Sequence, residues 1–154
     1  SLWYEVNNLE DINLPAFDLV KIRSINKAVL ELVDMGDLSA LKAINIGGVA
    51  ATLALMGFKN KIGCDVKLEP SSLDSLRLDE WMFSEAPGFV LTIAADKVDR
   101  ALHRLQAQDI SHWVLGVTKS EFNLKIYNAA LDRNWLDVNL NQVKSNWENG
   151  LNYE

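Results

Sequence analysis

The clearest pattern in this chain runs from Leu41 to Phe58, where one spacing of apolar residues gives way to another. Residues 41–46 alternate apolar and polar side chains, which is typical of a strand, and Gly47 and Gly48 follow as a turn. Residues 49–58 are small and apolar without a break, and their Ala, Leu and Met content favours a buried helix. The pattern therefore predicts a strand, a Gly-Gly turn and a helix, in this order.

Two other stretches have the period of an amphipathic helix. Residues 17–35 place apolar side chains near one face and charged side chains largely on the others, and Gly36 follows as a C′ glycine. Residues 97–107 repeat this pattern after Asp96, a residue type that begins helices. We expect both helices to pack on the sheet.

The remaining segments complete a predicted α+β fold. Strands are expected at 62–68, 89–93, 113–118 and 122–127, the last two joined by a hairpin loop, with a loop at 69–77, a short extended piece at 136–138 and helices at 78–84 and 139–149. This order indicates a single α+β domain over residues 17–154, with a mixed β-sheet and helices packed on it. Residues 1–16 lack a helical period and are expected to form an extended N-terminal arm.

Composition and charge narrow the function classes. A length of 154 residues suits one domain, and the first residue, Ser1, suggests a piece of a longer chain. A net charge of -6 argues against general binding to nucleic acid or to an anionic membrane. A single cysteine, Cys64, excludes an internal disulfide and fits a reducing compartment, so we expect a cytoplasmic protein.

The glycine turn, Gly47 and Gly48, carries the main candidate chemistry. Unpaired N–H groups at a helix N-terminus attract anions, so the amides of Gly47, Gly48 and Val49 are a candidate phosphate site. Lys42 on the preceding strand could neutralise such a phosphate. The alternative is that the glycines only make a tight turn and that Lys42 is solvated.

A second candidate is the Ser84-Glu85 pair, which comes before the turn at Pro87-Gly88. Glu85 could be held in a cleft as an acid, or both side chains could simply cap nearby backbone groups. No metal-ligand cluster, P-loop or nucleophile elbow stands out in the sequence, and no catalytic residue can be assigned from it.

Five landmarks occur together in an order that resembles a known family. They are Gly47-Gly48-Val49-Ala50, then Ile62-Gly63-Cys64-Asp65-Val66, then Phe83-Ser84-Glu85 leading into Phe89-Val90-Leu91, then Leu115-Gly116-Val117-Thr118, and the tail Asn146-Trp147-Glu148-Asn149-Gly150-Leu151. The chain resembles the C-terminal domain of the aminoimidazole ribonucleotide synthetase superfamily, most closely the second half of the phosphoribosylformylglycinamidine synthase branch.

The resemblance implies a role in purine biosynthesis. Enzymes of this branch convert an amide into an amidine with ATP and with ammonia from a glutaminase subunit or domain. The implied partners are therefore an N-terminal ATP-binding domain and a glutaminase. The phosphorylated substrate is expected in the cleft between domains, and ATP and Mg²⁺ mainly outside this chain, so that the isolated chain would be inactive.

The chain departs from the family where polar chemistry is expected. Before the two glycines the family usually has a His-Asp pair and a later acidic residue, whereas these positions hold Lys42, Ala43, Asn45 and Ile46 here. An isoleucine cannot bind a cation or accept a proton. Two alternatives therefore stay open: a non-catalytic module that keeps the fold for packing or oligomer contacts, and a domain from another branch, such as selenophosphate or hydrogenase-maturation enzymes.

Overall fold

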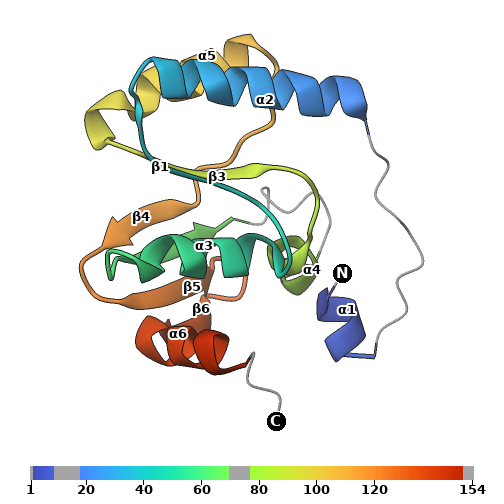
Figure 1. Ribbon diagram of the computed structural model, residues 1–154, viewed down its shortest axis with the longest axis vertical. Coiled ribbons are helices and arrows are strands. Elements are labelled where there is room, and N and C mark those ends of the chain that lie inside the picture. The colour runs from blue at the N-terminus through green and yellow to red at the C-terminus, as the bar shows by residue number, and fades with distance from the viewer. Residues whose placement is uncertain (1, 9–17, 70–76, 151–154) are drawn as a thin grey trace.

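The computed structural model describes residues 2–8, 18–69 and 77–150, and it has the predicted α+β architecture with a mixed sheet (Figure 1). The elements, in order, are α1 (Leu2–Val6), α2 (Leu19–Asp34), β1 (Leu38–Ala43), α3 (Gly48–Phe58), β2 (Gly63–Leu68), α4 (Leu78–Phe83), β3 (Phe89–Ile93), a 3₁₀ turn (Ala95–Lys97), α5 (Val98–Ala107), β4 (Gly116–Lys119), β5 (Asn123–Asn128), β6 (Arg133–Asn139) and α6 (Leu140–Asn149). Most of the loop predicted at 69–77 lies outside the described residues.

The larger core lies on a four-stranded mixed sheet of order β4-β2-β5-β6. Strand β2 runs parallel to β5 and antiparallel to β4, and β6 runs antiparallel to β5. Alternate residues of β2 and β5, such as Val66 and Ile126, face inward, as the alternation in the sequence predicts. Buried side chains of α3, α4 and α6, among them Met82 and Leu140, cover them.

A two-stranded antiparallel ribbon, β1 with β3, carries the second core. Helices α2 and α5 pack together over this ribbon, at the top of Figure 1, and bury Ala28, Leu32 and Ala101 completely. We predicted that these two helices would pack on the main mixed sheet, and this was wrong. Sequence periodicity indicates which face of a helix is buried, but it does not indicate which strands lie beneath that face.

The predicted hairpin between the last two sequence-predicted strands was also wrong. Strands β4 and β5 are joined by three residues, yet β2 lies between them, so the connection passes around the start of β2. The chain comes so close there that a Cβ on Gly63 would lie 2.0 Å from the Glu121 carbonyl oxygen and 2.3 Å from that of Asn123. The absence of a side chain at Gly63 is what makes room for this crossing.

The bounds of several strands differ from the predicted ones. Strand β1 spans Leu38–Ala43 instead of 41–46, because its pairing with β3 ends where Ala43 lies opposite Phe89. Strand β4 is shorter than predicted, and β6 is longer. The helices predicted at 17–35, 49–58, 78–84, 97–107 and 139–149 are confirmed within one or two residues.

The N-terminal segment is not simply extended. Residues 2–6 form the short helix α1, and Asn8, two residues after its end, has a positive φ of 52°. The Trp3 ring lies flat on the Phe83 ring, with centroids 4.3 Å apart and planes 5° apart. This stacking holds α1 against α4, and the sequence of residues 1–16 alone does not predict it.

Candidate functional site

Two loops meet at the N-terminus of α3. One is the connection from β1 to α3, and the other connects α4 to β3. The Ile44 amide donates a hydrogen bond to the Gly88 carbonyl (2.9 Å), and the Gly47 amide donates one to Glu85 Oε1 (3.1 Å). The fold therefore brings together the glycine turn and Glu85, which are 38 residues apart in the sequence.

Both glycines of the turn are required by the backbone. Gly47 has φ 83° and is the N-cap of α3, and Gly48 has φ 66°, so both occupy the left-handed region that disfavours side chains. A Cβ on Gly48 would also lie 2.6–2.7 Å from main-chain atoms of Met82 and Phe83. The turn thus lets the end of α4 rest directly against the start of α3.

Both glycine amides of the turn have acceptors inside the chain. Gly47 donates to the Glu85 carboxylate, and Gly48 donates to the Asn45 carbonyl at 2.9 Å. No side chain caps α3 from its N-cap position, and the next two residues, Val49 and Ala50, are buried. At the N-terminus of α3 an anionic oxygen therefore already binds one amide, and a main-chain carbonyl binds the next.

The other two predicted site residues, Ser84 and Lys42, differ in role. The Ser84 hydroxyl oxygen accepts a hydrogen bond from the Ala86 amide (3.3 Å), so it caps its own loop. Lys42 is half-buried in β1 opposite Val90, and its side chain makes no hydrogen bond to Gly47, Gly48 or Val49. The structure thus joins Glu85 to the glycine turn directly and leaves Lys42 outside this bonding.

One large apolar side chain beside the glycine turn is open to solvent. Ile46 is 62% exposed, and its amide is held by the Asn45 side-chain oxygen at 2.8 Å. A large apolar side chain in such a place gains little from burial.

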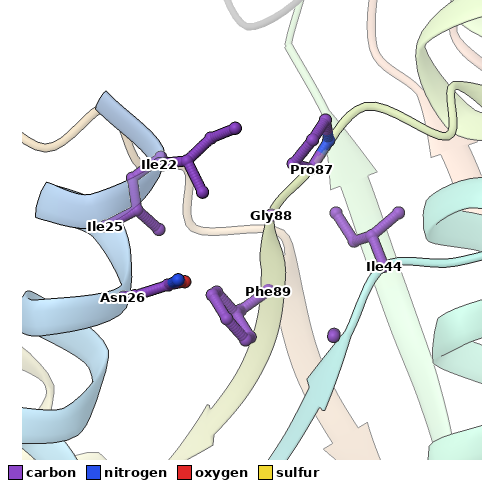
Figure 2. Close-up of a pocket in the computed structure, with 8 residues that line it drawn as sticks. Ile22, Ile25, Asn26, Ile44, Pro87, Gly88 and Phe89 are labelled. Atoms are coloured by element: carbon purple, nitrogen blue, oxygen red, sulfur yellow. The ribbon is translucent and has the colours of Figure 1, made fainter. Parts of the chain in front are cut away.

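A small apolar cavity lies beside these loops. It measures about 140 Å³ and is lined by Ile22, Ile25 and Asn26 from α2, and by Ala43, Ile44, Pro87, Gly88 and Phe89. In Figure 2 the α2 side chains face Ile44 and Pro87 across this space. Asn26 supplies the only polar side chain of this lining, so the cavity itself is unsuited to a phosphate.

Cys64 does not add a nucleophile. Burial, together with the neighbouring Asp65, raises the pKa of the Cys64 thiol from 9.0 to about 11, so the thiol is protonated at neutral pH. The described residues also contain no group of three or more His, Cys, Asp or Glu side chains that could hold a metal ion. None of the helices in the described ranges is long and apolar enough to cross a membrane.

Sequence reasoning missed two features of this site. Asn45 holds the turn through both its side chain and its carbonyl, and Gly88 ties the second loop to Ile44. An Asn two residues before a pair of glycines is a recognisable local signal, because Asn side chains bond to nearby backbone amides. The contact between Glu85 and Gly47 has no local signal, since it depends on tertiary structure.

The site thus consists of a left-handed glycine turn that joins a strand to a buried helix, and this helix packs on a mixed sheet. The family model for the AIR synthase related protein, C-terminal domain, matches residues 5–127. The chain belongs to this family.

Curated relatives point to one branch of the family. The chain is 33% identical over 129 residues to phosphoribosylformylglycinamidine synthase subunit PurL of Methanocaldococcus jannaschii, covering 82% of this chain and 17% of the relative. It is also 28% identical over 135 residues to probable membrane antigen 75 of Saimiriine herpesvirus 2, covering 88% of this chain and 10% of that protein. The chain thus spans less than a fifth of the length of these relatives.

Solved structures share the fold. PurLQS from Thermotoga maritima matches with a TM-score of 0.72 at 17% identity, over 84% of this chain and 22% of that chain. T. maritima PurL complexed with FGAR matches with a TM-score of 0.71 at 18% identity, over 83% and 21%. The hydrogenase maturation protein HypE in complex with ATP matches less well, with a TM-score of 0.54 at 18% identity, over 74% and 40%.

Proposed function

We propose that this chain is the C-terminal domain of a phosphoribosylformylglycinamidine synthase-like enzyme, an ATP-dependent ligase that converts an amide into an amidine in purine biosynthesis. Its contribution is one wall of the cleft that holds the phosphorylated substrate. Family membership and the similarity to PurL proteins support this proposal. The higher TM-score of PurL compared with HypE favours the purine branch over the hydrogenase-maturation branch.

One observation carries the substrate role: the Gly47 amide binds a carboxylate oxygen of Glu85 at 3.1 Å. The turn is therefore built to receive a negatively charged oxygen, and the partial positive charge at the start of α3 favours it further. Gly47, Gly48 and Val49 would bind the phosphate through their amides, with Lys42 supplying charge from β1; the Gly48 amide would have to leave the Asn45 carbonyl. In this proposal Glu85 gives up the Gly47 amide when the substrate phosphate arrives.

The cofactors and partners follow from the same proposal. ATP and Mg²⁺ would be bound mainly by an N-terminal ATP-binding domain, and a glutaminase would supply ammonia in the cytoplasm. Structures of T. maritima PurL complexed with ATP and with ADP share this fold, which supports ATP as the nucleotide. The described residues contain no group of three or more His, Cys, Asp or Glu side chains that could hold a metal ion, and no step of the reaction is assigned to them.

A non-catalytic module is the second candidate, and Ile46 favours it. This apolar residue is 62% exposed at a position where the family usually has an acid. The similarity to probable membrane antigen 75 adds support, since that relative is not named as a synthase. In this case the domain would keep its fold for packing or oligomer contacts and would bind no substrate.

Phosphate titration followed by NMR distinguishes the two candidates. We expect the amides of residues 47–50 to shift in the wild-type chain, with weak affinity, because a helix N-terminus contributes only about 0.3–1 kcal/mol for an exposed anion. Glu85→Gln should bind phosphate several-fold more tightly, since a competing charge is removed. Gly48→Asp should abolish the shifts, both by charge repulsion and because its Cβ would lie 2.6–2.7 Å from main-chain atoms of Met82 and Phe83 and displace the turn.

The matched control is Glu148→Gln, which removes one acid on α6 with a side chain that is 62% exposed. It changes the net charge equally and should leave the phosphate affinity unchanged. If the resonances of amides 47–50 do not shift while those of other amides do, the glycine turn does not bind phosphate. That result would support the non-catalytic module.

The activity of the isolated chain gives a separate prediction. We expect calorimetry with Mg-ATP to show no tight binding, because the described residues provide no acidic cluster for magnesium. Adding the ATP-binding part of the full-length protein should restore nucleotide binding. Micromolar affinity in the isolated 154-residue chain would contradict this division of labour.

A further inference from the structure

The N-terminal helix α1 rests on the residue that supports the glycine turn. A helix of five residues is not stable alone in water, so its form depends on its packing partner. Trp3 is stacked on Phe83, and the Tyr4 hydroxyl donates to Glu80 Oε1 at 3.5 Å. Both of these contacts are made to α4.

Phe83 connects this stack to the candidate site. Its main-chain carbon atoms lie 2.6–2.7 Å from the place where a Cβ of Gly48 would stand, so no space separates them from the turn. Two residues further along, Glu85 accepts the hydrogen bond from the Gly47 amide. A short and continuous set of contacts therefore leads from Trp3 to Gly47.

In the docked position of α1, one hydrogen-bond donor of Trp3 lacks an acceptor among the described residues. Its indole Nε1 is buried and has no hydrogen-bond partner within the part of the chain that the structure describes. A buried donor without an acceptor is unfavourable, because water would bind that donor if α1 were released. Ring stacking holds α1 in place while the unmet N–H group opposes it, so the docked and released forms are brought closer in free energy.

We propose that α1 is a strap that switches between docked and released forms and controls the contact between Glu85 and Gly47. Docked Trp3 fixes Phe83, and Phe83 holds the start of the following loop so that Glu85 reaches the Gly47 amide. Release of α1 loosens this hydrogen bond. The coupling is a property of the chain without ligand, so it does not require the proposed anion binding.

Amide hydrogen exchange measured by NMR tests the coupling. In Trp3→Ala the Gly47 amide should exchange roughly fivefold faster or more than in the wild type, the order expected for loss of an aromatic stack. In Trp3→Phe the rate should stay the same or fall, because a ring remains and the unmet N–H group is gone. Each rate is divided by that of the Ile126 amide, which lies in the core strand β5 and reports global unfolding.

Trp147→Ala is the matched control, since this tryptophan lies on α6 and is 55% exposed. It should leave Gly47 exchange unchanged. The Asn7 amide, which donates to the Trp3 carbonyl, reports whether α1 is intact. An unchanged Gly47 rate in Trp3→Ala would overturn the proposal, whether Asn7 is released or stays protected, and so would a Trp3→Phe protein that exchanges as fast as Trp3→Ala.

Discussion

The two ends of strand β1 use glycines of the same conformation in different surroundings. Gly36, before the strand, and Gly48, after it, both have φ of +66°. A Cβ on Gly36 would meet nothing within 4 Å, whereas on Gly48 it would lie 2.6 Å from the Phe83 carbonyl carbon. Gly36 is required by its dihedral angle alone, and Gly48 is required by its dihedral angle and by the close approach of α4.

The acids at the two ends differ in the same way. Asp37 is 1% exposed, and both of its oxygens are bound by Arg100, with Lys97 Nζ 4.0 Å away. Glu85 is half-buried and accepts from the neutral Gly47 amide. A carboxylate closed by an arginine has a structural role. The Glu85 carboxylate lies on a main-chain amide at the start of α3, and this is the end of the strand where we propose that an anion binds.

The largest effect should come from Gly48→Ala. We expect it to lower the free energy of unfolding by about 2–5 kcal/mol, because a left-handed alanine costs about 1–2 kcal/mol and overpacking adds about 1–3 kcal/mol. Gly36→Ala should cost only the first of these, about 1–2 kcal/mol. Urea denaturation of both variants measures the difference. Equal losses of unfolding free energy in the two variants would show that the close approach of α4 to Gly48 adds no constraint.

Arg100→Met should have the next largest effect. It leaves the buried Asp37 carboxylate with Lys97 alone, so we expect a loss of about 2–4 kcal/mol in unfolding free energy. Arg104→Met is the matched control on the same helix, since Arg104 pairs with the partly exposed Glu31 at 3.3 Å. That surface pair should be worth about 0–1 kcal/mol. Similar midpoints in thermal unfolding would show that Asp37 does not need its arginine.

Glu85→Gln should have the smallest effect on stability. Glutamine keeps a carbonyl oxygen for the Gly47 amide, so the expected loss is about 1 kcal/mol or less. Chemical denaturation of this variant and of Arg100→Met compares the unfolding free energy that the acid at each end of β1 contributes. A loss as large as that of Arg100→Met would mean that Glu85 is a structural acid, and its proposed exchange with phosphate would have to be abandoned.

Much of the fold could be predicted from periodicity. The five predicted helices from residue 17 onward are confirmed because each has a clear apolar face, a continuous apolar run or a clear end signal, such as Gly36. Strand pairing could not be predicted, because the side-chain alternation of β2 and β5 is the same whether their neighbours are parallel or antiparallel. A three-residue link normally indicates a hairpin, and only Gly63 hints that another strand fits between.

The candidate site was predicted in parts and not as a whole. Gly47, Gly48 and Glu85 each have a local signal, a turn or a loop near Pro87, but nothing in the sequence places Glu85 on the Gly47 amide. That contact follows from the packing of α4 against α3, which the Gly48 backbone permits. The short helix α1 escaped prediction for a related reason, since its stability comes from Phe83 and not from its own residues.

The position of β2 between β4 and β5 determines the order in which the sheet can assemble. Strands β5 and β6 are neighbours in sequence and in space, so they can pair early, starting at Asn128 with Arg133 beside the turn. Strand β2 must arrive from far away in the chain, with Cys64 beside Leu124, and it pairs only after a long loop has closed. Strand β4 cannot join the sheet before β2 does, because β4 pairs with β2, starting at Lys119 opposite Gly63. We therefore expect slow, non-local folding in which capture of β2 is the decisive step.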